Sequence, residues 1–319
     1  MPSEFDLIAR YFTRPTPQTL LGVGDDAALI SPTPGMNLVV STDMLAAGTH
    51  FFPDTDPEAL GWKCLAVNVS DLAAMAARPR WAVLSVALPQ ADERWIAAFA
   101  QGFFACAATF GIDVVGGDTT RGPMNFCVTI FGEVPQNQAL LRSGARPGDE
   151  IWVSGTPGRA ALGLAHLQGR CVLTGQALTD SLAALHRPQP RVALGLALRG
   201  LATAAIDVSD GLLADLGHIL ERSSVAATIH LENLPRSGSS GCPDPGLAWE
   251  CQLAGGDDYE LVFTAPENKH TAVASLSADL NLTLTCIGKI EAGNLPVVTV
   301  LDCESKPWIP PRHGFDHFA

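Results

Sequence analysis

The sequence predicts a two-domain α/β (α+β) protein, and three observations lead to this prediction. First, the chain has 319 residues, 47% hydrophobic and 17% charged, which suits a folded protein with a sizeable core. Second, strand-like apolar runs alternate with helix-like runs in both halves of the chain. Third, a polar, turn-rich stretch over 135–149 interrupts the alternation and is a candidate linker. We therefore expect domains at 1–136 and 137–319.

The first half of the chain predicts four strands and two long helices. The run over 57–77 predicts a buried helix, because it begins at a proline, is rich in Ala and Leu, and contains no helix breaker after Gly61. The other expected elements are a strand over 37–45, a strand over 81–88, a helix over 92–110, a short strand over 112–115 that ends at Gly116-Gly117-Asp118, and a strand over 125–134 closed by Pro135.

The second half repeats the alternation after the linker. Strands are expected over 151–154, 204–206, 226–231 and 261–264, followed by further strands to about residue 301. Helices are expected from Gly158, from Gly211 and over 266–278, with two more helical segments between the first two. The stretch over 235–245 (PRSGSSGCPDP) reads as a loop.

Composition excludes several classes of protein. A formal net charge of −13 argues against binding nucleic acid through its phosphates. No apolar run reaches the roughly 18–20 residues of a membrane helix, and Glu4 and Asp6 stand where a signal peptide would be basic. Eight cysteines, none in a CxxC pair and most in apolar surroundings, indicate reduced thiols in a cytoplasmic protein.

Six short motifs combine carboxylates with glycine or hydroxyl side chains, and most of them sit where a predicted strand ends. Each motif taken singly is explained more readily as a turn or a helix cap than as a ligand. Six in one chain are harder to explain in that way. The motifs are Gly24-Asp25-Asp26, Ser41-Thr42-Asp43, Ser70-Asp71, Gly116-Gly117-Asp118-Thr119-Thr120, Asp207-Val208-Ser209-Asp210-Gly211 and Gly255-Gly256-Asp257-Asp258.

Two of these motifs have specific structural alternatives. Asp25 and Asp26 lie between glycines and an apolar run, a composition that also suits a simple hairpin turn. Asp71 lies on an apolar helical run, where a buried carboxylate needs a partner. Lys63, eight residues earlier on about the same face, explains Asp71 equally well through an internal salt bridge.

The donor chemistry of the motifs favours magnesium and phosphate. Oxygen ligands without histidine or cysteine at ligand spacing suit Mg²⁺ rather than zinc, and Mg²⁺ shares its shell with water and substrate phosphates. Paired glycines let backbone N–H groups approach phosphate oxygens closely. The chain has no GxxxxGK[ST] motif and no protein-kinase motif set. The loose GxGxxA match at 22–27 is rejected, because its two Asp residues would face the pyrophosphate.

Three further residues are candidates on weaker grounds. His50 is suited to be a ligand or a substrate contact, or a capped loop histidine. Arg142, in LLRSGARPGD, is suited to hold a phosphate bidentately or to be a solvated linker residue. Phe315, in GFDHF, is suited to stack on an aromatic substrate or to anchor the C-terminal segment.

Taken together, the motifs resemble the thiamine-monophosphate kinase family over nearly the whole chain. The ordered set that carries the resemblance is GVGDDAAL, STDML, GTHF, GWKCLAVNVSDLAAMAARP, VVGGDTTRG, RSGARPGD, IDVSDGL, DLGHI, GGDDYEL and GFDHF. The wider superfamily is similar to aminoimidazole ribonucleotide synthetase, selenophosphate synthetase and hydrogenase-maturation proteins, which use ATP without a P-loop. The N-terminal segment, with Arg14-Pro15-Thr16-Pro17, is shorter and richer in proline than the family pattern.

The resemblance implies a fold and a set of site residues. The N-terminal domain would form a joint β-barrel in a homodimer, and the C-terminal domain would be an α/β sandwich. The residues implied for magnesium are Asp26, Ser41, Thr42, Asp43, Asp71, Asp118 and Asp207, with Asp210 as a further ligand. Catalysis would centre on Asp43, Asp71 and Asp118; ATP would contact Gly117, Asp118, Arg142 and Ser209; thiamine monophosphate would contact His50, Asp257 and Phe315.

The reaction that the resemblance implies is transfer of the ATP γ-phosphoryl group to thiamine monophosphate, giving thiamine diphosphate and ADP. The nucleophile is a phosphate oxygen that is mostly ionised near neutral pH, so no general base and no phospho-enzyme are expected. The alternatives are another ATP-using enzyme of the superfamily and a catalytically silent protein that binds nucleotide and magnesium. No cysteine precedes Cys64, and the chain ends in GFDHFA, which disfavours selenophosphate synthesis and hydrogenase maturation.

Overall fold

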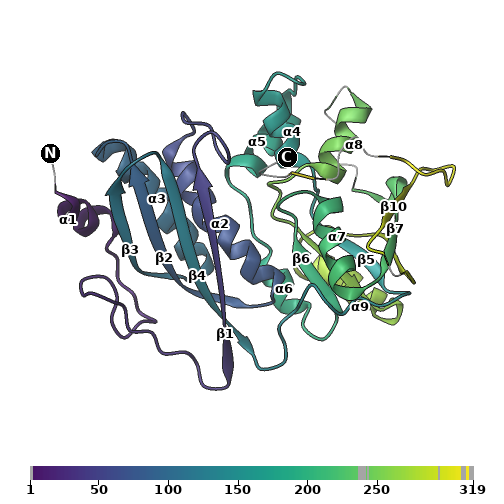
Figure 1. Cartoon of the computed structure of the whole chain (residues 1–319), viewed down its shortest axis with the longest axis horizontal. Helices are drawn as coiled ribbons and strands as arrows, with labels where there is room; N and C mark the ends of the chain where they lie inside the picture. Colours follow the sequence, from purple (N-terminus) through teal and green to yellow (C-terminus); the bar gives the residue numbers. More distant parts are fainter. Residues whose placement is uncertain (1–2, 236–241, 243, 294, 310–313, 316–319) are drawn as a thin grey trace. The chain divides into compact units, whose positions relative to one another are not determined.

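The computed structural model describes residues 3–235, 242, 244–293, 295–309 and 314–315. The chain folds into two compact units, one of Met1–Leu72 with Ala77–Asn137 and one of Ala73–Ala76 with Gln138–Ala319 (Figure 1). The domain bounds 1–136 and 137–319 stay a prediction of the sequence pattern. The described part of the chain contains no helix whose length and apolar character would let it cross a membrane.

The first unit is a four-stranded sheet in the order β1-β4-β2-β3 with helices α2 and α3 over one face (Figure 1). β4 is antiparallel to both β1 and β2, and β2 is parallel to β3. The strands are β1 (Met36–Ala46), β2 (Arg78–Leu88), β3 (Asp113–Arg121) and β4 (Asn125–Pro135); the helices are α1 (Glu4–Leu7), a π-helical turn (Ile8–Phe12), α2 (Pro57–Ala74) and α3 (Glu93–Phe110).

Aromatic packing holds α3 on this sheet. The ring of Phe99 stacks on that of Phe126 in β4, with 4.6 Å between the ring centroids, and both side chains are fully buried. The helix begins where the Asp92 carboxylate accepts hydrogen bonds from the N–H groups of Arg94 and Trp95. It ends at Gly111, whose φ of 66° suits glycine at this position.

Two glycines bring the backbones of α2 and α3 together. A Cβ atom on Gly61 would lie 2.0 Å from the carbonyl oxygen of Phe99, and one on Gly102 would lie 1.8 Å from that of Glu58. Any side chain at either position would force the helices apart. Gly61 therefore serves packing between helices rather than interrupting α2.

Two acidic motifs lie inside strands. The strand expected over 37–45 is confirmed by β1, whereas the expectation that a strand ends before Gly116-Gly117-Asp118 is wrong. β3 continues through Gly116-Gly117-Asp118 to Arg121, and Ser41-Thr42-Asp43 lies within β1. Gly117 sits so close to β2 that a Cβ atom would lie 1.9 Å from the carbonyl oxygen of Leu84. Glycine in this strand marks close backbone approach rather than the end of pairing.

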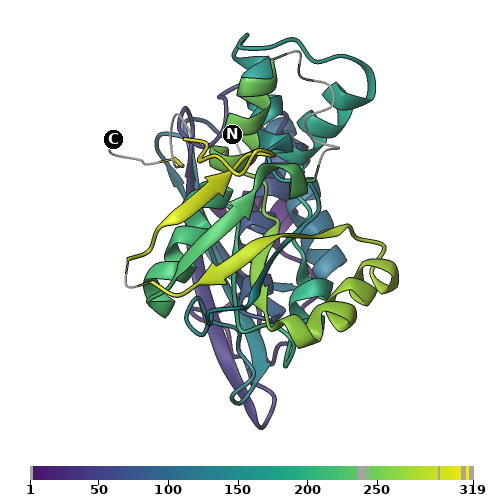
Figure 2. The same cartoon turned by 90° about the vertical axis from the view of Figure 1, so that its right-hand side faces the viewer.

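The second unit is a six-stranded sheet in the order β10-β7-β9-β5-β8-β6. Figure 2 shows β10, β7 and β9 as neighbouring arrows. β10 is parallel to β7, and the other neighbours are antiparallel. The strands are β5 (Glu150–Ser154), β6 (Ala204–Asp207), β7 (Ala226–His230), β8 (Leu261–Ala265), β9 (Leu284–Glu291) and β10 (Val298–Leu301). The helices are α4 (Arg159–Leu167), α5 (Gly175–His186), α6 (Val192–Ala197), α7 (Leu212–Ser223), α8 (Pro245–Ala254) and α9 (His270–Asp279), with 3₁₀ turns at Leu231–Asn233 and Glu267–Lys269.

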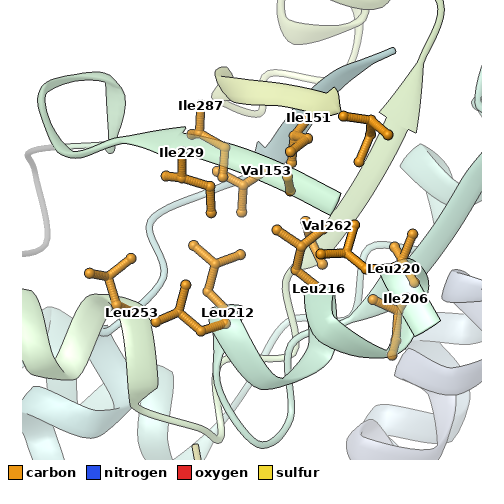
Figure 3. Close-up of a cluster of buried hydrophobic side chains, with 14 of the residues drawn as sticks. Ile151, Val153, Ile206, Leu212, Leu216, Leu220, Ile229, Leu253, Val262 and Ile287 are labelled. Atoms are coloured by element: carbon orange, nitrogen blue, oxygen red, sulfur yellow. The ribbon is translucent and has the colours of Figure 1, made fainter. Parts of the chain in front are cut away.

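One apolar layer joins α7 to this sheet (Figure 3). Leu212, Leu216 and Leu220 recur at every fourth residue of α7 and are fully buried against sheet residues such as Ile151 and Val262. The helix is thereby fixed directly after the Asp207–Gly211 motif. The loop expected over 235–245 falls largely outside the described residues, since 236–241 and 243 are not described.

The close approach of α2 and α3 predicts opposite effects for two Gly→Ala substitutions. In a free helix alanine is favoured over glycine by about 1 kcal/mol. Gly61→Ala should nevertheless lower the free energy of unfolding by about 1–3 kcal/mol, because the new methyl group meets the Phe99 backbone. Gly217→Ala in α7, where no atom other than those of the adjacent helix backbone lies within 4 Å of the added Cβ, should raise it by about 0.5–1 kcal/mol. Urea unfolding measures the free energy of unfolding of both variants. A Gly61→Ala variant more stable than the unchanged protein would contradict the close packing of α2 on α3.

Candidate functional site

Two acidic motifs of the first unit border one cavity. The cavity has a volume of about 540 Å³, and the loop Gly24–Ala28 and the segment Gly116–Thr119 of β3 both line it. Phe5, Ile8 and Phe12, from the N-terminal helical turns, add an apolar wall. The cavity therefore combines acidic, glycine-rich loops with an apolar surface, a combination that suits a ligand with charged groups and a ring.

The loop that carries Asp25 and Asp26 is a turn closed by backbone pairing. The N–H of Leu29 donates to the carbonyl of Leu21 at 2.8 Å, and Gly24 has a φ of 129°, which only glycine adopts readily. Asp25 Oδ1 accepts a hydrogen bond from the N–H of Asp26 at 2.9 Å, and both side chains are exposed. Asp25 thus orders the turn and presents Asp26 to solvent, so a turn and a ligand site are compatible here.

Strand alternation divides the Ser41-Thr42-Asp43 motif between the two faces of β1. The Ser41 hydroxyl donates to Asp71 Oδ2 of α2 at 2.5 Å, so Ser41 points to the helix-covered face, and Asp43 shares that face. Thr42 points the other way, where its Oγ1 lies 3.1 Å from Thr129 Oγ1 of β4. The side chains of Ser41, Asp43 and Asp71 are brought to one face, and that of Thr42 is not.

Asp118 and His50 occupy different settings in the first unit. Asp118 is exposed on β3 and lies opposite Ser85 of β2. His50 Nδ1 accepts a hydrogen bond from the N–H of Ala46 at 3.0 Å. The neutral ring therefore carries its proton on Nε2, which makes that nitrogen a donor suited to a phosphate oxygen.

In the second unit, a buried carboxylate organises the Asp207–Gly211 motif. Asp207 is 4% exposed at the end of β6. Asp215 of α7 accepts hydrogen bonds from the N–H groups of Ser209, Asp210 and Gly211 at 3.0–3.1 Å. Burial, and then the charge of Asp210, raise the pKa of Asp215 to about 7, while the three backbone donors oppose the shift. Asp215 holds the backbone of this motif in place, a role that the sequence analysis did not predict.

The Gly255–Glu260 segment contains two buried carboxylates with structural partners. Asp258 accepts hydrogen bonds from the N–H groups of Gly158 and Ala160, at 2.5 and 3.1 Å, at the start of α4. Burial raises the pKa of Asp258 well above its usual value, although these two N–H donors oppose the rise. Glu260 forms a bidentate ion pair with Arg191, with N···O distances of 2.5 and 2.6 Å. Their neighbour Asp257 is only partly buried.

Backbone hydrogen bonds bring the candidate residues of the second unit together. The N–H of Asp257 donates to the carbonyl of Ser209 at 2.8 Å, and the N–H of Phe315 donates to that of Asp210 at 3.0 Å. The Phe315 side chain is 48% exposed. Arg142 is also exposed, and its carbonyl accepts a hydrogen bond from the Ser223 hydroxyl at 3.3 Å.

Among the described residues, no three His, Cys, Asp or Glu side chains are arranged to hold a metal ion by themselves. Mg²⁺ in phosphoryl-transfer sites is bound by one or two carboxylates, with water and substrate phosphates completing its shell. The oxygen donors Asp26, Asp43 and Asp118 fit that role, since each presents a carboxylate that is exposed or only partly buried.

The sequence reasoning also missed the apolar wall of the first cavity and the tyrosine beside Asp257. Phe5, Ile8 and Phe12 recur at spacings of three and four, a helical stripe that was detectable but carries no chemical signal by itself. The Tyr259 hydroxyl donates to Asp257 Oδ1 at 3.1 Å. The sequence GGDDYEL does not by itself show which side chains of the segment point outward.

The chain is similar to known proteins over nearly its whole length. The family "AIR synthase related protein, N-terminal domain" matches residues 24–134, and "AIR synthase related protein, C-terminal domain" matches residues 146–301. The thiamine-monophosphate kinase of Escherichia coli (strain K12) is 46% identical over 323 residues, which cover 99% of this chain and 98% of that protein.

Two solved structures are similar to this chain in both sequence and fold. The thiamine-monophosphate kinase of Stenotrophomonas maltophilia K279a has a TM-score of 0.84 and 48% identity, covering 92% of this chain and 94% of that one. A structure described as "AaThiL complexed with AMPPCP and TMP" has a TM-score of 0.76 and 31% identity, covering 93% and 92%. The predicted two-domain α/β fold is confirmed. The chain belongs to the thiamine-monophosphate kinase family of AIR synthase related proteins.

Proposed function

We propose that this protein phosphorylates thiamine monophosphate with ATP, giving thiamine diphosphate and ADP. The observation that carries the proposal is likeness over nearly the full chain to kinases of this activity, one of them solved with AMPPCP and TMP. The O–P bond between the β- and γ-phosphates of ATP breaks, and a phosphate oxygen of thiamine monophosphate forms the new O–P bond. The electron pair of the broken bond leaves with ADP.

In this reaction the protein must position the two phosphate groups and compensate their negative charge, and it does not need to supply a base. The attacking phosphate oxygen is already ionised, so no side chain needs to remove a proton. Two polyanions must be brought into line, and Mg²⁺ when bound supplies the positive charge that lets them approach. The protein residues orient the phosphates and hold the carboxylates in place.

We assign the metal ligands by motif position. In the first unit these are Asp26, Ser41, Thr42, Asp43, Asp71 and Asp118, and in the second unit Asp207 and Asp210. The oxygen-only donor set supports Mg²⁺. Because Thr42 faces away from Asp43 and Asp71, its side chain would not share an ion with theirs. Asp43, Asp71 and Asp118 are the carboxylates on which catalysis depends.

We assign the substrate contacts in the same way. ATP contacts Gly117, Asp118, Arg142 and Ser209; the glycine allows close approach, and the exposed Arg142 guanidinium suits a phosphate. Thiamine monophosphate contacts His50, Asp257 and Phe315. The Nε2–H of His50 suits its phosphate, and the exposed ring of Phe315 suits its aromatic rings.

The exposed face of the four-stranded sheet supports a homodimer. Leu38, Val40 and Met44 alternate along edge strand β1 with their side chains 43%, 56% and 59% exposed. Such a largely apolar row, interrupted only by Thr42, is typical of an interface between protein chains. We infer that two copies join through this face to form the barrel. Free thiols, among them Cys64, Cys127 and Cys303, support a reducing, cytoplasmic location.

The proposed reaction predicts a product that can be separated chromatographically. Purified protein with ATP, Mg²⁺ and thiamine monophosphate should yield thiamine diphosphate and an equal amount of ADP. EDTA should abolish the product, and free thiamine should yield no diphosphate. ATP binding without thiamine diphosphate would exclude the proposed kinase activity and favour a silent binder or a sister enzyme, and ADP without an acceptor would indicate an ATPase.

The metal assignment predicts a loss of rate without a loss of fold. Asp43→Asn and Asp118→Asn should each lower kcat by about 100-fold or more, because a contact that stabilises the transferring phosphoryl group is weakened. Asp279→Asn, at the exposed end of α9, is the matched control and should keep full activity. Unfolding midpoints report the fold, and near-normal rates for both variants would overturn the assignment.

The dimer predicts that a charge on β1 separates the subunits. Val40→Lys should convert the dimer to a monomer, because the ammonium group would be buried in an apolar interface. Val172→Lys replaces a valine of the second unit that is even more exposed, at 68% against 56% for Val40, and should leave the mass in solution unchanged. Sedimentation equilibrium measures both, and a Val40→Lys dimer as stable as that of the unchanged protein would contradict the interface.

A further inference from the structure

The segment Gly255–Glu260 divides its side chains into two sets. Asp258 and Glu260 are buried, with exposed fractions of 7% and 6%. Asp257 and Tyr259, which alternate with them, are only partly buried. The first pair anchors the segment, and the second pair remains accessible.

The anchors bind two different parts of the second unit. Asp258 accepts hydrogen bonds from the N–H groups of Gly158 and Ala160 at the start of α4. Glu260 accepts from Arg191 and from the Ser154 hydroxyl of β5, the latter at 2.6 Å. Carboxylates that are buried and multiply bonded in this way are fixed in position.

The backbone next to the anchors is held in an unfavourable conformation. Asp257 has a φ of 72° and Tyr259 a φ of 52°, in the left-handed region that is unfavourable for a residue other than glycine. The backbone hydrogen bonds from Asp257 to Ser209 and from Tyr259 to Val208, at 2.8 and 2.9 Å, help to hold it there. The resulting turn brings the Tyr259 hydroxyl to within 3.1 Å of Asp257 Oδ1.

The pair lies beside other residues that we assign to substrates. The backbone N–H of Asp257 donates a hydrogen bond to the carbonyl of Ser209, the candidate ATP contact. The backbone N–H of Phe315 donates one to the carbonyl of the adjacent Asp210. A carboxylate repels a phosphate and attracts a cation or an amino group. Thiamine monophosphate has both at its ring end, namely the thiazolium ring and the pyrimidine amino group. Asp257 therefore suits the ring end rather than the phosphate.

We propose that Tyr259 is a positioning residue that holds the Asp257 carboxylate toward the ring end of thiamine monophosphate. The proposal rests on the proposed kinase function and deepens it. The phenol hydroxyl donates to Oδ1 and fixes the rotamer of a short side chain whose backbone is already fixed by the two anchors. Tyr259 acts through Asp257 and has no role of its own in the chemical step.

A double-mutant cycle tests this coupling. Tyr259→Phe should raise the KM for thiamine monophosphate about tenfold, the size expected for one hydrogen bond to a charged group, and leave kcat and the KM for ATP nearly unchanged. Asp257→Ala should raise the same KM further. In the double variant the tyrosine change should add nothing, because the carboxylate that it positions is gone.

The chain offers a matched control, because it contains only two tyrosines. The Tyr11 hydroxyl also donates to a carboxylate, Glu93 Oε2, at 2.9 Å in the first unit. Tyr11→Phe removes the same atom from the same kind of bond and should leave every kinetic constant unchanged. Unfolding midpoints and calorimetric titration with thiamine monophosphate accompany each variant.

The possible outcomes distinguish a failure of this inference from a failure of the proposed kinase function. If the unchanged protein forms no thiamine diphosphate, the proposed function fails and this inference fails with it. If the unchanged protein is active but the effects of Tyr259→Phe and Asp257→Ala multiply, the two side chains act independently and only the inference fails. Tyr259→Phe with a normal KM overturns it in the same way, and a lower kcat for this variant would place Tyr259 in the chemical step.

Discussion

The repulsion between carboxylates is the constraint on which the rest of this structure depends. The chain has 33 acidic and 20 basic residues, and many of the acidic residues lie in short clusters. Carboxylates in such clusters destabilise one another unless each is neutralised, hydrogen-bonded or solvated. Across the chain the structure separates two kinds of carboxylate. Asp215, Asp258 and Glu260 are buried and bonded, whereas Asp26 and Asp118 are exposed.

Glycines make this separation sterically possible. A Cβ atom on Gly155 would lie 1.8 Å from Glu260 Oε1, and one on Gly256 would lie 2.2 Å from the carbonyl oxygen of Ser209. The absent side chains leave room for the buried carboxylates and for the docking of one motif on another. The glycines of these motifs therefore serve the packing of the loops as well as any contact with phosphate.

The sequence predicted the alternation of elements and the acidic motifs, but not the role of each acidic residue. Apolar periodicity marked α3 and β4 because each buries one regular face, and an unbroken apolar run marked α2, which is buried nearly all round. It ended β3 too early, since Gly116 and Gly117 are poor strand formers that pairing with β2 holds in the sheet. Asp257 and Asp258 are adjacent residues of the same type, so the sequence alone does not distinguish their roles. Only the positive φ angles and the approach of α4 make one of them accessible and the other an anchor.

The most direct test of this division is a crystal structure with Mn²⁺ in place of Mg²⁺, together with thiamine monophosphate and an ATP analogue that cannot transfer its phosphoryl group. Anomalous scattering would locate each ion. We expect ions beside Asp26, Asp43 and Asp118 and phosphate oxygens in their shells, with none at Asp215, Asp258 or Glu260. Ions coordinated by these three buried carboxylates, or fully occupied ligands without any ion near the exposed ones, would contradict the account.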